Sequence, residues 1–176
     1  MLKDSVLMVF FSSGRGGGEQ VDYGYKGKGV TSHLLVEKSG RPLVIISTPA
    51  SSDERQQVFP VLSKIRRLIS KVWQQGKVPI LEADKGYDAK EVRRDALFHR
   101  VFPMITYRKK TKGYKSQGVC YLEKQRWVVE RTISWLKTRF RRLSVRWERK
   151  TKYWDGFLLF SLAGYWTTFL SRWMLK

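Results

Sequence analysis

The sequence of 176 residues is poor in cysteine, histidine and acidic residues. Cys120 is the single cysteine, which excludes a disulfide within the chain and fits a reducing, cytoplasmic environment. The two histidines, His33 and His99, are far apart in the sequence, and an isolated histidine is usually structural. Asp and Glu total 15 against 35 Lys and Arg, a formal net charge of +20 that favours polyanionic partners.

Long hydrophobic runs are also missing. The apolar stretch at residues 156–170 is shorter than the roughly 20 residues that a membrane span needs. Two threonines and Arg172 interrupt its end, so it predicts a buried helix. Residues 1–11 carry charges of both signs and lack a convincing cleavage site, so we expect no signal or transit peptide there.

The chain is rich in aromatic and basic residues instead. Seven Trp, eight Tyr and nine Phe exclude a disordered chain, and the length predicts a single domain over residues 1–176. Residues 108–152 carry 16 of the 35 basic residues and only three acids. A solvated helix face would have more counter-charges, so this segment indicates a nucleic-acid surface.

The hydrophobic pattern predicts strands and helices in a definite order. Short apolar, β-branched runs predict strands at residues 6–11, 31–37, 42–48, 78–83 and 102–107. Apolar residues at helical spacing predict helices at residues 53–75, 88–99, 122–142 and 154–174. The first three strands suit an antiparallel meander, and later strands that alternate with helices suit parallel extension. The expected fold class is therefore α/β with a mixed sheet.

A glycine-rich segment at residues 12–29 predicts a loop at a hairpin tip. It has no GKS or GKT ending, which excludes the phosphate-cradling loop of nucleoside triphosphatases. The first predicted helix carries one buried stripe, formed by Val58, Leu62, Ile65, Ile69 and Val72.

Two acids stand out in basic surroundings. Asp84 follows a predicted buried strand, and reactive groups of open α/β sheets gather at the carboxyl ends of strands. Glu130 lies midway along a basic helix, in line with Arg126 and Lys137 and beside the apolar face, so we expect it to border the core. Carboxylates can hold a divalent cation, and the basic residues around them can bind phosphate. The combination indicates phosphodiester chemistry.

Each acid also has a simpler explanation. Asp84 is suited to cap a helix that begins near Tyr87. Glu130 is suited to an ordinary ion pair with Arg126 or Arg131 on the helix surface. A metal site for phosphoryl transfer usually needs three or four oxygen ligands, and a third should come from the first strand.

Three motifs resemble the DDE transposases of bacterial insertion sequences, whose catalytic domain has a ribonuclease-H-like fold. ADKGYDAKEVR is similar to the second-acid motif of that family, and RWVVERTISWLKTRFRRL to its third-acid motif. YKGKGVTSHLLVEKSGRPLVIISTPAS resembles the basic loop, strand, turn and strand that the family places upstream. The resemblance covers residues 10–170. Arg126 and Lys137 match the family's third-acid signature, whereas Glu123 stands where the family has Tyr, with Tyr121 nearby.

The resemblance implies a catalytic and metal-binding set of Asp84, Glu130 and one first-strand acid. It also implies two Mg²⁺ or Mn²⁺ ions, one activating water or a DNA 3′-hydroxyl and the other stabilising the leaving oxygen. Residues 6–13 contain no acid. Asp4 is the candidate by residue type and Asp22 is a later alternative; otherwise the first ligand has been lost.

The resemblance further implies a DNA partner. Arg126, Lys137, Arg139, Arg141 and Arg142 are expected to hold the backbone of double-stranded DNA at terminal inverted repeats. A homo-oligomer on DNA, in a bacterial cytoplasm and with no membrane contact, is implied as well.

The chain begins close to the catalytic motifs, so we expect the usual N-terminal DNA-binding helices to be absent. A truncated copy, or one product of an element read in two frames, would have this form. A DNA-binding remnant that has lost catalysis and inhibits a full-length copy is the alternative. A basic RNA-binding or ribosome-associated protein is a third reading, but it gives no reason for the two acids.

Overall fold

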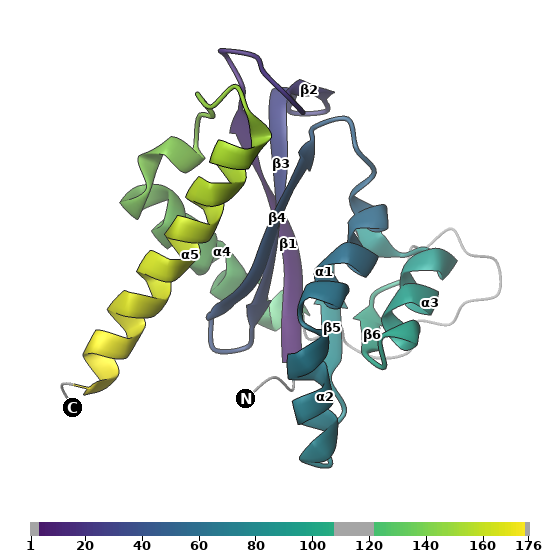
Figure 1. Cartoon of the computed structure of the whole chain (residues 1–176). Coiled ribbons are helices and arrows are strands. Elements are labelled where there is room, and N and C mark those ends of the chain that lie inside the picture. The colour runs from purple at the N-terminus through teal and green to yellow at the C-terminus, as the bar shows by residue number, and fades with distance from the viewer. Residues whose placement is uncertain (1–3, 108–121, 175–176) are drawn as a thin grey trace.

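The chain folds around one sheet, and the computed structural model describes residues 4–107 and 122–174 of it (Figure 1). The strands are β1 (Asp4–Ser13), β2 (Asp22–Gly24), β3 (Gly27–Glu37), β4 (Pro42–Pro49), β5 (Ile80–Ala83) and β6 (Phe102–Ile105). The helices are α1 (Val58–Lys64), α2 (Arg66–Gln74), α3 (Lys90–Phe98), α4 (Leu122–Arg139) and α5 (Thr151–Met174), joined in places by the 3-10 turns η1 (Glu54–Gln57), η2 (Lys85–Tyr87) and η3 (Arg141–Leu143). Residues 108–121, which include Cys120 and Tyr121, lie outside the described residues.

β1 is a central strand that pairs with β3 on one side and with β5 on the other. The β1–β3 pairing is antiparallel and runs from Ser5 opposite Glu37 to Ser13 opposite Gly29. β5 lies parallel to β1, and β6 lies parallel to β5. β4 and the short β2 pair antiparallel along the far side of β3. This topology confirms the predicted ribonuclease-H-like class, a meander extended by parallel strands that alternate with helices.

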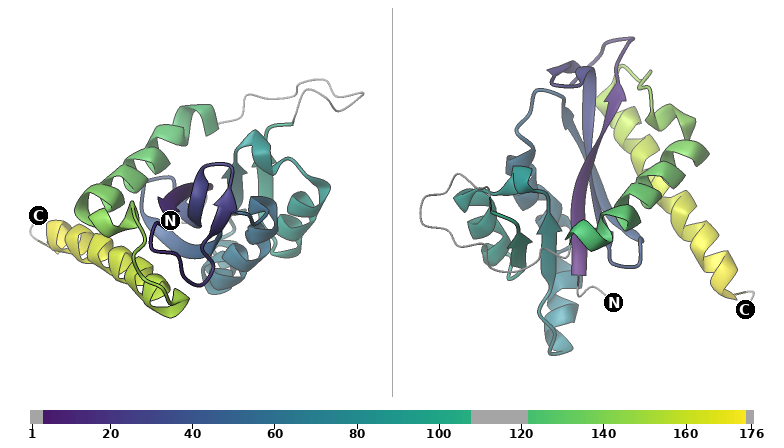
Figure 2. Two further views of the ribbon diagram at one scale, coloured as in Figure 1. Left: turned by 90° about the horizontal axis from the view of Figure 1, so that it is seen from above. Right: turned by 180° about the vertical axis from the view of Figure 1, so that it is seen from behind.

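Side-chain alternation along the strands builds two separate cores. Leu7 and Leu81 face a core that α1, α2 and α3 cover, whereas Val6 and Phe10 face a core covered by α4 and α5. Figure 2 shows these two helix groups on opposite faces of the sheet. Trp154 of α5 is fully buried in the second core. The sheet is therefore the middle layer of three.

The predicted helix at residues 53–75 is interrupted in the structure. Its segments are η1, α1 and α2, and Ile65 joins the two α-helices with φ −105° and ψ 14°. The predicted buried stripe is confirmed, because all five of its residues lie in the first core. The prediction of one continuous helix was wrong, since the amide of Ile65 bonds to the carbonyl of Leu62 in a tighter turn that periodicity does not reveal.

The predicted buried helix near the C-terminus forms as α5 but is buried on one side only. Trp154, Leu158 and Leu162 enter the core, while Leu159 and Phe160 are exposed. The apolar composition of α5 therefore does not predict how much of it is buried, because only one face of the helix packs against α4 and the sheet. Among the helices of the described ranges, none has the length and apolar character to cross a membrane.

His33 and Glu82 are buried ionisable residues within the sheet. His33 on β3 is fully buried, and its Nε2 lies 2.8 Å from the Thr48 hydroxyl. Burial lowers the pKa of His33 to about 4. Glu82 on β5 is also buried, and within residues 4–107 and 122–174 its Oε2 has no hydrogen-bond partner. Burial, and to a lesser degree the charge of Asp4, raise the pKa of Glu82, while Lys38 opposes the rise.

His33 should make the protein sensitive to mild acid. The His33 imidazole takes up a proton near pH 6.5 in the unfolded chain and only near pH 4 in the folded protein. Its contribution to the free energy of unfolding is therefore complete above pH 6.5 and is lost as the pH falls toward 4. The loss should reach about 3 kcal/mol by pH 4. Urea unfolding from pH 7 to pH 4 should show a clearly flatter profile for His33→Gln. The His99→Gln control should change the slope less, because burial also lowers the pKa of His99 but to a smaller extent. Equal slopes for all three proteins would contradict the assignment.

Glu82→Gln should stabilise the protein at pH 7. Above its raised folded pKa the ionised carboxylate is buried without full compensation, so removing the charge should add about 1 kcal/mol to the free energy of unfolding. The gain should shrink below pH 4.5, where Glu82 binds a proton in both states. Exposed Glu91→Gln is the matched control, for which no gain is expected. A loss of stability on Glu82→Gln at pH 7 would contradict this assignment.

Candidate active site at the carboxyl end of the sheet

Asp84 lies just past the carboxyl end of β5, as predicted, and begins η2. Its backbone is extended (φ −64°, ψ 160°), and its carboxylate accepts a 2.6 Å hydrogen bond from the amide of Lys85. The simpler explanation, a capping aspartate, is therefore present in the structure. Capping uses one oxygen of the carboxylate, and Asp84 is exposed at the strand end.

Glu54 of η1 is an acid near Asp84 that sequence reasoning missed. Burial raises the pKa of Glu54; Lys26 opposes the rise, and the charges of Asp53 and Asp84 add to it. Both Glu54 and Asp84 also add to the effect of burial in raising the pKa of the Tyr87 hydroxyl. The sequence gives no signal for this proximity, because η1 and η2 are some 30 residues apart and meet only when the sheet forms.

Lys137 of α4 reaches the same end of the sheet. Its Nζ donates a 3.0 Å hydrogen bond to the carbonyl of Phe11 near the end of β1 and lies 5.0 Å from the centre of the Phe10 ring. Burial, and then the charge of Lys26, lower the pKa of Lys137. Lys26 and Glu54 in turn line one small cavity of about 80 Å³ together with Phe11. Asp84, Glu54, Lys26 and Lys137 form what is called the carboxyl-end cluster below.

Asp4 lies elsewhere on the same strand pair. β1 begins at Asp4, so the first strand does contain an acid. Asp4 pairs with Ile80 at the start of β5. Leu7 pairs with Ala83, so Met8 is the residue of β1 that comes alongside Asp84. Four residues along a strand correspond to about 13 Å, which separates Asp4 from that position. The Asp4 carboxylate lies 3.3 Å from the Lys38 ammonium.

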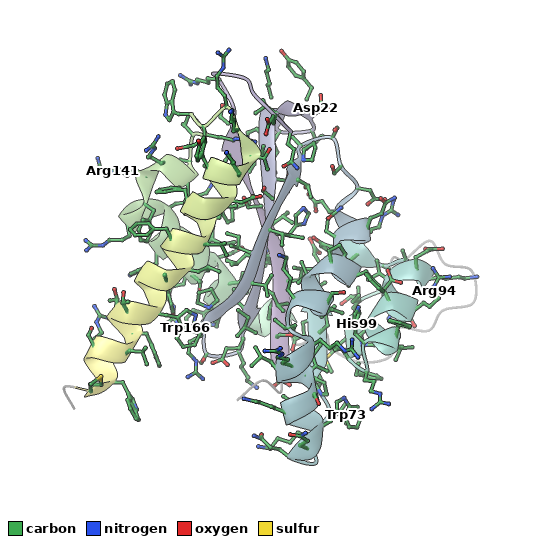
Figure 3. The ribbon with its side chains drawn as sticks, viewed as in Figure 1. Asp22, Trp73, Arg94, His99, Arg141 and Trp166 are labelled. Carbon is green, nitrogen blue, oxygen red and sulfur yellow. The ribbon has the colours of Figure 1, made fainter. Side chains whose placement is uncertain are left out.

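Asp22, the later alternative, is also separated from β1. It lies in β2 opposite Gly29 of β3, so β3 stands between it and β1. Its carboxylate accepts hydrogen bonds from the Ser51 hydroxyl and the Tyr23 amide, which lower the pKa of Asp22. Asp22 appears at the upper end of the sheet in Figure 3.

Glu130 occupies an exposed flank of α4. Its Oε1 lies 2.8 Å from Nε of Arg126, one turn earlier, and 53% of its side chain is exposed. The expectation that Glu130 borders the core was wrong, because Val129 and Leu136 take the core positions of this helix. The simpler explanation for Glu130, a surface ion pair with Arg126, is therefore present in the structure.

The predicted DNA-binding arginines differ in their contacts. Arg139 and Arg141 are exposed, and Arg141 projects from the outer side of the helical layer in Figure 3. Arg142 is exposed too, but its Nη2 lies 2.7 Å from Glu148 and its guanidinium 5.7 Å from the Phe157 ring. Arg139 and Arg141 therefore offer the more accessible positive charge.

The three predicted acids do not meet at one point. Asp84 lies at the carboxyl end of β5, Asp4 at the start of β1, and Glu130 on the flank of α4. Within residues 4–107 and 122–174, no group of three His, Cys, Asp or Glu side chains is placed to hold a metal ion. The carboxyl-end cluster is thus a site of two carboxylates and two lysines. Chemically it can attract a cation and bind phosphate.

The sequence matches known transposases over most of its length. A family model described as the transposase DDE domain matches residues 4–154. A protein of Burkholderia cepacia, named as a transposase for insertion sequence element IS402, is 35% identical over 133 residues. The alignment covers 74% of this chain and 59% of that protein, so the chain spans less than two thirds of its relative.

Solved transposase structures show a more distant likeness. A piggyBac transposase in a synaptic complex with hairpin DNA gives a TM-score of 0.46 at 9% identity, over 64% of this chain and 24% of that one. The catalytic domain of the Mos1 mariner transposase gives 0.43 at 11% identity, over 79% and 70% of the two chains.

The family match begins at Asp4 and spans both Asp84 and Glu130. The bacterial relative agrees with it over three quarters of the chain. The resemblance to DDE transposases of bacterial insertion sequences is therefore confirmed, and the chain belongs to the transposase DDE domain family.

Proposed function

We propose that this chain is the catalytic domain of a transposase that cleaves and joins DNA strands at the ends of an insertion sequence. The carboxyl-end cluster is the observation that carries the proposal, since it gathers Asp84, Glu54 and two lysines where β5 ends. Carboxylates suit a divalent cation and lysines suit phosphate, so this composition fits phosphodiester chemistry.

In this proposal Asp84 and Glu130 are the catalytic acids, Asp4 is the candidate first acid, and two Mg²⁺ or Mn²⁺ ions are the cofactors. Such ions, when bound, supply Lewis-acid activation of the attacking oxygen. The described residues fit an ion only in part, because the strand register separates Asp4 from Asp84. The side chains themselves hold negative charge at the strand end, with Lys26 close enough to Glu54 and Lys137 to influence the pKa of each.

The proposed DNA contacts are Arg126, Lys137, Arg139, Arg141 and Arg142. Arg139 and Arg141 should contribute most to binding, because Lys137 and Arg142 already contact protein groups. The proposed partner is double-stranded DNA that carries the terminal inverted repeats, bound by a homo-oligomer of this chain. Phosphate contacts of this kind position the enzyme and do not read sequence.

A non-cleaving DNA-binding remnant is the second candidate function. One observation favours it: Met8, rather than an acid, comes alongside Asp84 on β1. A chain of this kind would keep the basic surface and bind element ends without breaking them. It would inhibit a full-length transposase by occupying those ends or by forming mixed oligomers.

Substitution of the proposed acids should separate cleavage from binding. Asp84→Asn and Glu130→Gln should each slow Mn²⁺-dependent nicking of a plasmid with terminal inverted repeats by about 100-fold or more, since a metal ligand supplies several kcal/mol. Affinity for the same DNA, measured by fluorescence anisotropy, should change less than about twofold. Asp95→Asn on α3 is the matched control and should nick at the parent rate.

The remaining acids then identify the first ligand. Loss of nicking in Asp4→Asn would assign Asp4, and loss in Glu54→Gln with activity kept in Asp4→Asn would assign Glu54. Full activity of Asp84→Asn would contradict the proposal. Binding without nicking by the parent chain would establish the remnant instead.

Arg141→Gln should weaken DNA binding through electrostatics alone. Removing one phosphate contact should reduce the slope of log K against log salt by about 0.9. The control is Arg94→Gln, an exposed arginine on α3 at the opposite side of the molecule (Figure 3). A titration of duplex DNA between low and physiological salt measures both slopes, and a parallel decrease in the two variants would show that no localised surface exists.

A further inference from the structure

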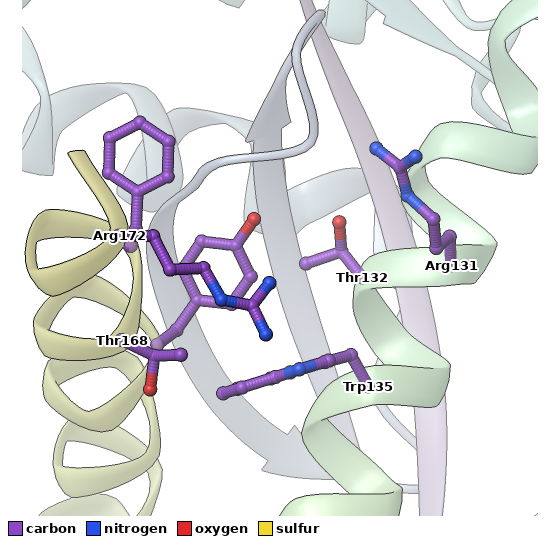
Figure 4. Close-up of a pocket in the computed structure, with 7 residues that line it drawn as sticks. Arg131, Thr132, Trp135, Thr168 and Arg172 are labelled. Atoms are coloured by element: carbon purple, nitrogen blue, oxygen red, sulfur yellow. The ribbon is translucent and has the colours of Figure 1, made fainter. Parts of the chain in front are cut away.

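A larger pocket lies between α4 and α5, apart from the carboxyl-end cluster (Figure 4). Its volume is about 330 Å³, and Trp135, Tyr165 and Phe169 contribute aromatic walls. Arg172 of α5 reaches across the pocket toward Trp135 in Figure 4. Arg131 of α4 lines the rim, where its guanidinium lies 4.8 Å from the centre of the Trp127 ring. Sites for small ligands measure about 300 to 1,000 Å³, so the space suits one compact group.

The walls of this pocket are held in place by the turn between β3 and β4. The carbonyl of Gly40 accepts hydrogen bonds from the Thr132 hydroxyl at 2.7 Å and the Tyr165 hydroxyl at 3.0 Å. Gly40 has φ 90°, a conformation that favours glycine. The Trp135 and Tyr165 rings meet edge to face at 5.0 Å. A ligand would therefore meet walls that are already arranged.

Positive charge predominates around the pocket. Burial raises the pKa of the Tyr165 hydroxyl; Arg131 and Arg41 oppose the rise, and Glu37 adds to it. Glu37 is ion-paired with Arg41, whose guanidinium lies 5.3 Å from the Phe169 ring. In the part of the chain that the structure describes, no carboxylate forms an ion pair with Arg131 or Arg172. The pocket thus combines aromatic surface with guanidinium groups suited to an anion.

The pocket and the acid-bearing surface lie on different flanks of α4. Arg126, Glu130 and Lys137 share one flank, whereas Arg131 and Trp135 turn toward α5. Consecutive helical residues differ by about 100° in direction, which is why neighbours such as Glu130 and Arg131 serve different surfaces. A ligand in the pocket would not compete with one at the carboxyl-end cluster.

We infer that this pocket binds one unpaired nucleotide of a DNA strand. Aromatic faces stack on any base, and arginine binds phosphate through paired hydrogen bonds, so the pocket matches both parts of a nucleotide. Paired bases in a duplex stay stacked and leave the aromatic walls empty. The inference rests on the proposed function and deepens it. It identifies a single-stranded segment of DNA as a ligand and places that segment in the pocket between α4 and α5, apart from the proposed catalytic acids.

Binding of a fluorescein-labelled oligo(dT) strand of 12 nucleotides tests the pocket by anisotropy, with a duplex of equal length measured beside it. Arg131→Gln and Arg172→Gln should each weaken binding of the single strand about tenfold and of the duplex less than about twofold. Lys152→Gln removes the same charge from the far end of α5 and should weaken both DNAs equally and slightly. Circular dichroism confirms folding of each variant.

Two further binding measurements identify which part of the ligand the pocket recognises. An abasic strand of the same length should bind the parent about tenfold more weakly than oligo(dT), because it lacks bases to stack. Thymidine monophosphate should displace the strand only at concentrations far above those of the oligonucleotide.

Three results would overturn the inference. They are equal binding of abasic and normal strands, equal losses for single strand and duplex in the arginine variants, and binding of the monophosphate as tight as that of the strand. Nicking and duplex binding report on the proposed function separately, so its failure would be seen as absent nicking, with or without duplex binding. A chain that binds and nicks duplex but ignores bases would retain the proposed function and lose only this inference.

Discussion

The parallel pairing of β1 with β5 is the contact on which the rest of the structure depends. It joins the antiparallel meander to the part of the sheet that carries Asp84, and it fixes which residue of β1 lies beside that acid. A shift of one residue would exchange Val6 and Leu7 between the two cores, so burial on both faces holds the register firmly. The position of Asp4 relative to Asp84 is therefore a consequence of core packing.

Lys137 illustrates how a strongly basic chain organises its charges. Its ammonium binds the carbonyl of Phe11 and lies over the Phe10 ring, which fastens α4 to the end of β1. The same contact brings the positive flank of α4 close to the carboxylates at the strand ends. Glu82 shows the opposite situation, a carboxylate buried in the sheet with one oxygen that no group in the described part of the chain bonds. Protein groups thus satisfy the charge of Lys137 and only part of the charge of Glu82, while the net charge of +20 favours polyanionic partners.

α4 serves three surfaces at once. One face supplies Val129 and Leu136 to the core, one flank carries Glu130, and the other flank lines the pocket shared with α5. The arrangement gives one helix a role in both the proposed cleavage and the inferred recognition of an unpaired nucleotide.

The sequence by itself determined the order of the longer strands and helices, the mixed sheet and the family, because hydrophobic periodicity and contiguous motifs are local properties. It also placed Asp84 at a strand end, since the apolar run before it has the length of a buried strand. It missed the short β2, which lies in the segment predicted as a loop. The break at Ile65, the exposure of Glu130 and the exposed side of α5 needed the tertiary structure, because burial depends on which faces meet. The proximity of Glu54 to Asp84, and the separation of Asp4 from it, were likewise decided by strand register, which joins segments far apart in the chain.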